Sequence, residues 1–252
     1  MSHSEPEATH SKSGNSVEYH ITPMEDWENV NADLAIVDPP FGIEFSGTES
    51  NYNRDESSVV EGYVEWAVDE YTEKIDNLIE SLHRNLAEDG QALILSGWNN
   101  SHIIHKQLLE SEFTLEGKLY WSYNFAPYCQ KRPAHNVYEI FWVVKDKNEW
   151  SYTNECSFDH CTEGEANLSH IDVKRDYHRD MPKYPTRLPE KLVKILIEHF
   201  SDENDRVFDP CAGSGMVGIA AAEMNRNATL GDLNREAMEV FEEISKMMQD
   251  DE

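Results

Sequence analysis

An acidic residue, two prolines and an aromatic residue stand together near the start of the chain, in the order Asp38, Pro39, Pro40 and Phe41. The apolar run before them, residues 34–37, is typical of a strand covered on both faces, and consecutive prolines cannot continue its hydrogen-bond ladder. We therefore expect the carboxylate at the carboxyl edge of a sheet, where open α/β folds bind ligands. An acid beside a backbone carbonyl and an aromatic ring suits a planar base with an exocyclic amine. A strand that simply ends in a Pro-Pro turn is the alternative, because so short a motif recurs by chance.

A second segment repeats this order of strand, acid and tight turn. Its turn residues, which we expect to contact a cofactor, are Asp209, Pro210, Cys211, Ala212, Gly213, Ser214 and Gly215. The two glycines let the backbone approach a ligand closely, and the alanine-rich stretch 216–224 predicts a helix whose N-terminus points at the same place. A short strand then ends at Asp232, and an acid there commonly accepts hydrogen bonds from ribose hydroxyls. A dinucleotide-binding unit is the competing interpretation, since Gly218 completes a G-x-G-x-x-G pattern, but nothing in the chain suggests nicotinamide chemistry.

These segments resemble the motifs of the S-adenosylmethionine-dependent DNA amino-methyltransferases. The segment at Asp38 matches motif IV, the loop at Asp209 matches motif I, and Asp232 matches the acid of motif II. Pro185 and Thr186 begin a segment that matches the Pro-Thr-x-x-Pro pattern of motif X, which lies against the methionine end of the cofactor. The catalytic motif comes first and the cofactor motifs last, an order that resembles the permuted β group of this family.

The resemblance implies transfer of a methyl group from S-adenosylmethionine to the exocyclic amine of a base flipped out of double-stranded DNA. The Asp38 carboxylate and the Pro39 carbonyl would hold the amine, while Phe41 stacks on the base, so that no covalent intermediate is required. An Asp at position 38 favours adenine N6 slightly over cytosine N4. A Rossmann-type NAD-dependent oxidoreductase and an inactive DNA-binding protein of the methyltransferase fold are the alternatives.

The expected fold is α/β, with a Rossmann-like methyltransferase sheet of seven strands, one of them antiparallel, and a small inserted recognition region. Apolar spacing predicts helices over 64–86 and 102–109, a strand over 91–96, and an antiparallel pair over 115–123 and 137–144. We expect a disordered tail at 1–16, the catalytic half at 17–148, a target-recognition insert at 149–182 and the cofactor-binding half at 183–252.

The charge balance is unusual for a protein that binds phosphates, with 21 basic against 49 acidic residues and a net charge of −28. Acidic residues spread over the whole chain indicate adaptation to high salt, as in a halophile or its virus, because screening there is nearly complete. Basic residues concentrate between 118 and 194. The residues expected to contact DNA are Arg54, Lys131, Arg132, Lys174, Arg175 and Arg179, although some of these bases could simply offset neighbouring acids.

The four cysteines do not form a metal-binding or disulfide pattern. Cys156, His160 and Cys161 lack CxxC spacing, so we expect no metal and free thiols. Cys129 does not follow a proline as the nucleophile of cytosine ring-carbon methyltransferases does. The polar start of the chain has no signal-peptide core, and no membrane-spanning run occurs, so a cytoplasmic protein is expected. A homodimer and a cognate restriction enzyme on a separate chain remain open as partners.

Overall fold

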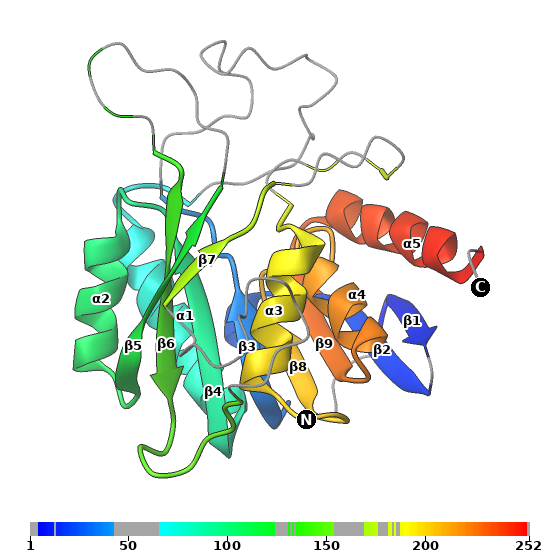
Figure 1. The fold of residues 1–252 in the computed structure, drawn as a ribbon, viewed down its shortest axis with the longest axis horizontal. Helices are drawn as coiled ribbons and strands as arrows, with labels where there is room; N and C mark the ends of the chain where they lie inside the picture. The colour runs from blue at the N-terminus through cyan, green and yellow to red at the C-terminus, as the bar shows by residue number, and fades with distance from the viewer. Residues whose placement is uncertain are drawn as a thin grey trace.

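The computed structural model of the chain describes residues 5–12, 14–42, 66–123, 131, 133, 135–153, 169–175, 181–182, 184 and 187–250. These residues form one sheet in the order β1-β2-β9-β8-β3-β4-β6-β5-β7 (Figure 1). Its strands are β1 (Ala8–Lys12), β2 (Asn15–Ile21), β3 (Ala32–Val37), β4 (Leu86–Ser96), β5 (Thr114–Ser122), β6 (Val137–Val144), β7 (His170–Asp172), β8 (Arg206–Asp209) and β9 (Asn227–Asp232).

The described sheet therefore has nine strands, and the prediction of seven was wrong. Strands β2, β9, β8, β3 and β4 are parallel neighbours, whereas β6 is antiparallel to both β4 and β5. The seven strands from β2 to β5 match the predicted number with β6 as the antiparallel member. Two short strands extend this sheet at its edges, β1 antiparallel to β2 and β7 parallel to β5.

Strands β3 and β8 lie side by side at the point where the chain reverses its direction of travel across the sheet. From β3 the chain passes through α1 (Tyr71–Asn85) to β4, and from β8 it passes through α4 (Met216–Glu223) to β9 on the opposite side. Right-handed crossovers in opposite directions put the two helices on opposite faces of the sheet. Open α/β sheets bind ligands at the carboxyl ends of the strands at such a switch point.

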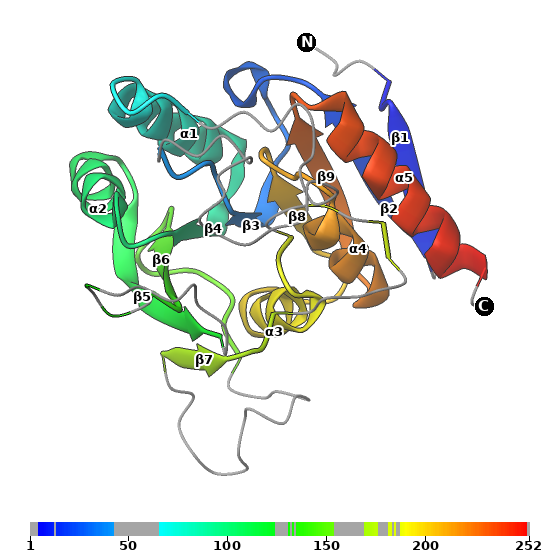
Figure 2. The same ribbon diagram turned by 90° about the horizontal axis from the view of Figure 1, so that it is seen from above.

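The alternating side chains of β3 contact a different core on each face. Leu34 and Ile36 belong to the core under α3 (Glu190–Phe200), α4 and α5 (Arg235–Asp250), while Ala35 and Val37 belong to the core under α1 and α2 (Ser101–Glu110). Figure 2 shows α1 and α2 on one side of the central strands and α3 and α4 on the other. A strand buried on both faces explains why the sequence before Asp38 is continuously apolar.

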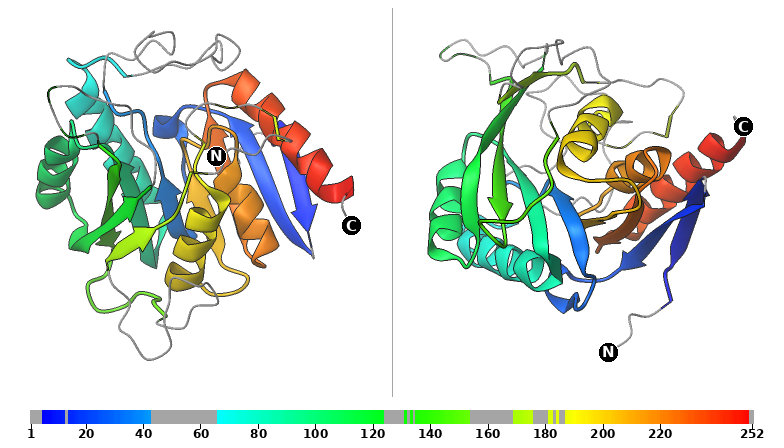
Figure 3. Two further views of the ribbon diagram at one scale, coloured as in Figure 1. Left: turned by 45° about the horizontal axis from the view of Figure 1, so that its top comes forward. Right: turned by 60° about the horizontal axis from the view of Figure 1, so that its bottom comes forward.

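The N-terminal residues 5–12 and 14–16 are part of the fold, which corrects the prediction of a disordered tail at 1–16. Ala8–Lys12 pairs with β2 in a hairpin, and this hairpin lies beside α5 (Figure 3). Lys12 lies 3.5 Å from Glu223 at the end of α4, and the same carboxylate lies 2.6 Å from Lys194 of α3. The composition of this segment is polar, but Ala8 and His10 are buried, and β1 contacts both α4 and α5.

The described parts of the predicted recognition insert, 149–182, lie against the sheet. Strand β7 pairs with β5, and Thr153 donates its backbone N–H to the His199 carbonyl at 3.0 Å. The Gln91 amide on β4 donates to the Ser151 carbonyl. The remaining residues of the insert, including Arg179, lie outside the described residues, and its role in target recognition stays a prediction.

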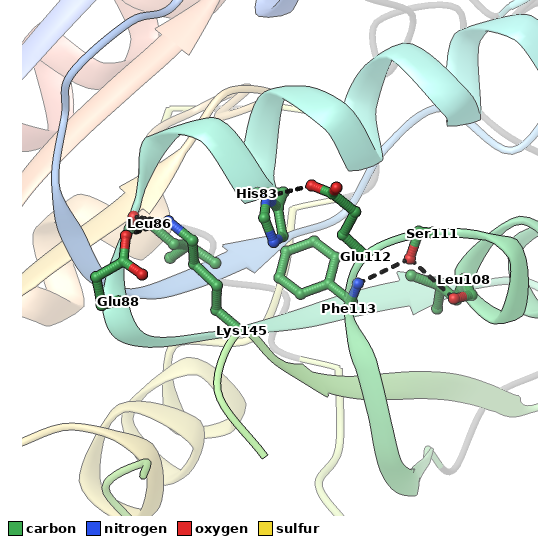
Figure 4. Close-up of polar contacts among 8 residues, drawn as sticks. All are labelled: His83, Leu86, Glu88, Leu108, Ser111, Glu112, Phe113 and Lys145. Atoms are coloured by element: carbon green, nitrogen blue, oxygen red, sulfur yellow. Dashed lines mark hydrogen bonds and ion pairs between the residues drawn. The ribbon is translucent and has the colours of Figure 1, made fainter. Parts of the chain in front are cut away.

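The predicted antiparallel pair is confirmed as β5 and β6, and the predicted helix at 102–109 as α2. Helix α1 begins at Tyr71, later than the predicted 64, after a turn at 68–70. Its last turn carries His83, which lies 3.5 Å from Glu112 and packs edge-on against Phe113 (Figure 4). Within the described residues, no helix is long and apolar enough to cross a membrane.

Candidate functional site

Three carboxylates lie at the carboxyl edge of three neighbouring parallel strands. Asp38 follows β3, while Asp209 and Asp232 end β8 and β9. Asp209 is buried, with 3% of its surface exposed, and Asp232 is half-buried. The structure therefore brings together the predicted catalytic acid and the two predicted cofactor acids at the switch point of the sheet.

The loop from 209 to 215 turns tightly by means of two glycines with positive φ. Gly213 has φ 51° and Gly215 has φ 75°, both in the left-handed region. A Cβ on Gly215 would lie only 2.4 Å from the ring of Phe241 on α5, so this position has no room for a side chain. Gly215 then forms the N-cap of α4, where its backbone N–H bonds to the Ala212 carbonyl at 2.8 Å.

Two acids, Asp209 and Asp232, accept hydrogen bonds from the backbone of this loop. The Asp209 carboxylate accepts a hydrogen bond from the Cys211 N–H at 3.0 Å. The Asp232 carboxylate accepts from the Gly213 N–H and from the Asn234 N–H, both at 2.8 Å. Pro210 is buried and Ala212 donates to the Gly231 carbonyl at 2.9 Å, so the loop is joined to β9 along its length.

Burial controls the protonation of these acids. It raises the pKa of Asp209 well above the ordinary value and raises that of Asp232, while backbone N–H groups oppose the shift in both. Burial also raises the pKa of the Cys211 thiol, so this cysteine is a packing residue and not a thiolate. The charge of Asp38 contributes to the shifts of Asp209 and Cys211.

Three further side chains contact the loop from 209 to 215, called the cofactor loop below: one from the N-terminal hairpin, which sequence reasoning missed, and two from the motif X segment that were not among the predicted cofactor residues. Tyr19 on β2 donates its hydroxyl to the Gly213 carbonyl at 2.7 Å, and its pKa is raised by burial and then by Asp232. The Tyr184 ring lies where a Cβ on Gly213 would come within 3.2 Å of it. Arg187 donates Nε to the Ser214 hydroxyl at 3.3 Å. No local pattern marks Tyr19 as a site residue, since it lies 194 residues from Gly213 in the sequence.

The resemblance implies that this loop would hold the methionine and ribose ends of S-adenosylmethionine, and its residues present groups of the kind that this role needs. A carboxylate has about four lone-pair positions, and the two backbone bonds to Asp232 leave capacity for ribose hydroxyls. The backbone at Gly213 can be approached closely because it carries no Cβ. Carboxylates gathered at one sheet edge suit a cofactor with a positive charge. Of the motif X residues, Pro185 and Thr186 lie outside the described residues, while Pro189 directly precedes α3.

The segment from Asp38 to Gly42 is held by the turn before α2 and by a side chain of β6. Asn100 donates its amide to the Phe41 carbonyl at 2.7 Å and to the Gly42 carbonyl at 3.1 Å. The Phe41 ring lies over Gly97, where a Cβ would approach it to 3.2 Å, and 5.3 Å from the ring of Tyr138. Pro39 is buried, while Asp38, Pro40 and Phe41 are half-buried. The acid and the aromatic ring therefore share one partly open loop.

The basic residues predicted to contact DNA fall into three groups. Lys131 and Lys174 are exposed. Arg175 is half-buried and donates to the Tyr138 hydroxyl at 2.9 Å. Arg54, Arg132 and Arg179 lie outside the described residues. The exposed lysines can contact a phosphate, whereas the Arg175 guanidinium is half-buried and already bonded to Tyr138.

The described residues contain no group of three side chains that could hold a metal ion. Cys211 is a free thiol. Cys129, Cys156, His160 and Cys161 lie outside the described residues, so the predictions for them remain predictions.

Comparison with known proteins identifies one family. The family profile described as "DNA methylase" (N6_N4_Mtase) matches residues 32–243. The chain is 25% identical over 230 residues to the DNA adenine methyltransferase YhdJ of Escherichia coli (strain K12). The alignment covers 82% of this chain and 73% of that protein. It is 22% identical over 253 residues to the Type II methyltransferase M.HpaI of Haemophilus parainfluenzae, with coverage of 88% and 71%.

Solved structures share the fold. The cytosine-N4-specific PvuII DNA methyltransferase superposes with a TM-score of 0.71 at 15% identity, covering 96% of this chain and 90% of that chain. The M1.HpyAVI structure in complex with S-adenosylmethionine superposes with a TM-score of 0.68 at 18% identity, covering 91% and 98%.

Proposed function

This chain belongs to the DNA methylase family of N6-adenine and N4-cytosine methyltransferases, and we propose that it methylates the exocyclic amine of a base flipped out of double-stranded DNA. The observation that carries this proposal is the meeting of Asp38 with the Asp209 loop and Asp232 at one switch point. A base held by Asp38 and a cofactor held by the Asp209 loop and Asp232 would lie side by side.

The cofactor of the family is S-adenosylmethionine, as predicted from the sequence. When bound, it supplies a methyl group on a positively charged sulfur. Gly213 and Gly215 would let the backbone approach the methionine end, and Asp232 would accept hydrogen bonds from the ribose. Tyr19 holds the Gly213 carbonyl in place. The role of Asp209 is to brace the loop through Cys211, because its carboxyl is buried and its pKa is raised.

Asp38 and Pro39 carry the chemical step in this proposal. The lone pair of an exocyclic amine is conjugated with its ring and is therefore a poor nucleophile. Hydrogen bonds from the amine to the Asp38 carboxylate and the Pro39 carbonyl would draw the nitrogen toward tetrahedral geometry and hold it for in-line attack. Phe41 would stack on the extruded base, and the Asn100 amide on its carbonyl keeps the ring in the loop.

Several finer features belong to the same proposal. The catalytic motif precedes the cofactor motifs, which supports the permuted β group, and Asp at position 38 supports adenine N6 over cytosine N4. Lys131 and Lys174 are the exposed bases that we assign to phosphate contacts. DNA is the proposed macromolecular partner, and any restriction enzyme would be a separate chain. Sedimentation of the protein with and without DNA tests the predicted homodimer.

The net charge of −28 supports a protein that works in high salt. In dilute buffer, repulsion between the acids opposes both folding and the approach of DNA, and salt screens both. We therefore expect thermal stability and methyl transfer to rise together between about 0.1 M and molar potassium chloride, over which the Debye length shrinks from about 10 Å to about 3 Å. A Tm and an activity that both decline over this range would contradict adaptation to salt.

The two alternative functions differ from methyl transfer in what they predict. An NAD-dependent oxidoreductase is excluded by the family to which the chain belongs. An inactive DNA-binding protein would bind S-adenosylmethionine or DNA without methyl transfer.

The direct experiment is transfer of a labelled methyl group to unmethylated DNA at molar salt, followed by mass spectrometry of the nucleosides. We expect N6-methyladenine. Asp38→Asn keeps the size of the side chain but removes its charge, and it should lower the rate by at least about a hundredfold, the effect typical of losing a group that stabilises a transition state. The exposed Asp89→Asn is the matched control. Equal rates for wild type and Asp38→Asn would refute the assignment, and N4-methylcytosine would correct the base.

A further inference from the structure

Arg175, three residues after β7, lies among aromatic rings and is only partly open to solvent. Its guanidinium carbon lies 5.0 Å, 4.6 Å and 5.3 Å from the ring centroids of Trp121, Tyr123 and Tyr138. Its Nη2 also donates to the Tyr138 hydroxyl at 2.9 Å. A guanidinium is attracted to aromatic faces, so these contacts fix its position.

The same aromatic cluster contacts the segment from Asp38 to Gly42, called the catalytic loop below. The rings of Trp121, Tyr123 and Tyr138 lie 5.0–5.9 Å apart. The ring of Tyr138 lies 5.3 Å from that of Phe41 at an angle of 60°. A continuous row of contacts therefore runs from Arg175 through Tyr138 to the ring that we propose to stack on the target base.

The backbone that carries Arg175 is anchored two residues earlier. Val173 donates its N–H to the Ser122 carbonyl at 3.1 Å, and the Val173 carbonyl accepts from the indole N–H of Trp121 at 2.8 Å. Trp121 is fully buried. Arg175 thus projects from a braced segment, which is what a positioning role requires.

Electrostatics link Arg175 to Asp38. Burial alone would lower the pKa of the guanidinium, but the phenols of Tyr138 and Tyr123 and the Asp38 carboxylate raise it above its ordinary value. The Asp38 carboxylate also contributes to the raised pKa of Tyr138, so the acid, the phenol and the guanidinium lie within electrostatic reach of one another.

We infer that Arg175 is a positioning residue, which seats Tyr138 against Phe41 and so fixes the ring that we propose to stack on the target base. This inference rests on the methyltransferase activity proposed above, and it removes Arg175 from the phosphate-binding set. It also gives the segment between β7 and α3 a direct connection to the catalytic loop.

The test compares Arg175→Met with Lys174→Met, which removes the same charge from the adjacent exposed side chain. Single-turnover methyl transfer to unmethylated DNA of mixed sequence is measured over a range of DNA concentrations with S-adenosylmethionine in excess, which separates the rate of the bound complex from DNA affinity. For Arg175→Met we expect the rate of the bound complex to fall about tenfold or more, with affinities for DNA and cofactor close to those of wild type. For Lys174→Met we expect weaker DNA binding with an unchanged rate of the bound complex.

If thermal unfolding shows that Arg175→Met is poorly folded, two milder variants still test the inference. Arg175→Lys keeps the charge but not the planar fork that lies among the rings, so its rate should fall by less than that of Arg175→Met while both affinities stay unchanged. Tyr138→Phe keeps the ring against Phe41 and should lose less.

Specific results would overturn the inference. A wild-type rate of the bound complex in both Arg175 variants would do so, as would a purely DNA-affinity defect equal to that of Lys174→Met. Those results require an active wild type. A wild-type protein that transfers no methyl group instead refutes the proposed function, and the inference with it.

Discussion

The two loops that meet at the switch point are positioned in opposite ways. The cofactor loop is held mainly by neighbours within about one helical unit of sequence, since the Cys211 N–H donates to Asp209 and the Gly213 N–H donates to Asp232, with Tyr19 as a contact from a distant strand. The catalytic loop is held by Asn100 and Tyr138, which come from elements 59 and 97 residues further along the chain. The first loop is thus a local structure that the strand, turn and helix build together, whereas the second depends on the surrounding tertiary fold.

The largest effect in the cofactor loop is expected from Gly215→Ala. The substitution places a Cβ at positive φ and 2.4 Å from the buried Phe241 ring, so we expect a loss of about 2–4 kcal/mol of unfolding free energy. Gly14→Ala is the control, because Gly14 also has positive φ but nothing within 4 Å of its Cβ position. Chemical denaturation should show a clearly smaller loss for Gly14→Ala, and equal losses would mean that the clash with Phe241 is relieved.

Removing the charge at Asp232 tests the cofactor loop without disturbing the catalytic one. Asp232→Asn has a single acceptor oxygen for the two N–H groups that the carboxylate now satisfies, and it loses charge toward the ribose. We expect S-adenosylmethionine to bind about ten- to a hundredfold more weakly by calorimetry, the range for a hydrogen bond to a charged group. The exposed Glu116→Gln should bind like wild type. An unchanged affinity in Asp232→Asn would remove this acid from the cofactor site.

Asn100→Asp makes the converse test on the catalytic loop. The variant keeps the shape of the side chain but cannot donate to the Phe41 and Gly42 carbonyls. We expect the methyl-transfer rate to fall about tenfold, since each bond contributes about 1 kcal/mol, with cofactor affinity unchanged. The exposed neighbour Asn99→Asp serves as the control for added charge. If cofactor affinity fell as much as the rate, the two loops would not be independent.

The smallest effect lies away from both loops, at His83. Burial lowers its pKa below the ordinary 6.5, helped by Lys145 and opposed by Glu112 and Glu88. The unfolded chain therefore binds the proton more readily, and this residue subtracts stability as pH falls through 6.5 toward the folded-state pKa. Between pH 8 and pH 5, the Tm of His83→Gln should decrease by less than the Tm of wild type. The Tm of the exposed control His102→Gln should decrease by as much as that of wild type. A wild-type pH dependence in His83→Gln would exclude this contribution.

Residues whose role depends on adjacent sequence were predictable. The run from Asp209 to Gly215 and the acid at Asp232 could be recognised because strand, turn and helix N-terminus follow one another, and local hydrogen bonds build the loop. The burial of β3 on both faces was also legible from its apolar composition. Strands β1 and β7 were not, because each is short and owes its existence to a neighbour, β2 or β5, in a distant part of the chain.

The sequence by itself determined the family of motifs, the identity of the cofactor and the acid expected to hold the amine, because these depend on residue types at short spacing. Only the tertiary structure decided what surrounds that acid. Asn100 and Tyr138 come to Phe41, and Arg175 to Tyr138, from three separate parts of the chain. Sequence spacing carries no record of such contacts, since the packing of the sheet and its crossovers sets them.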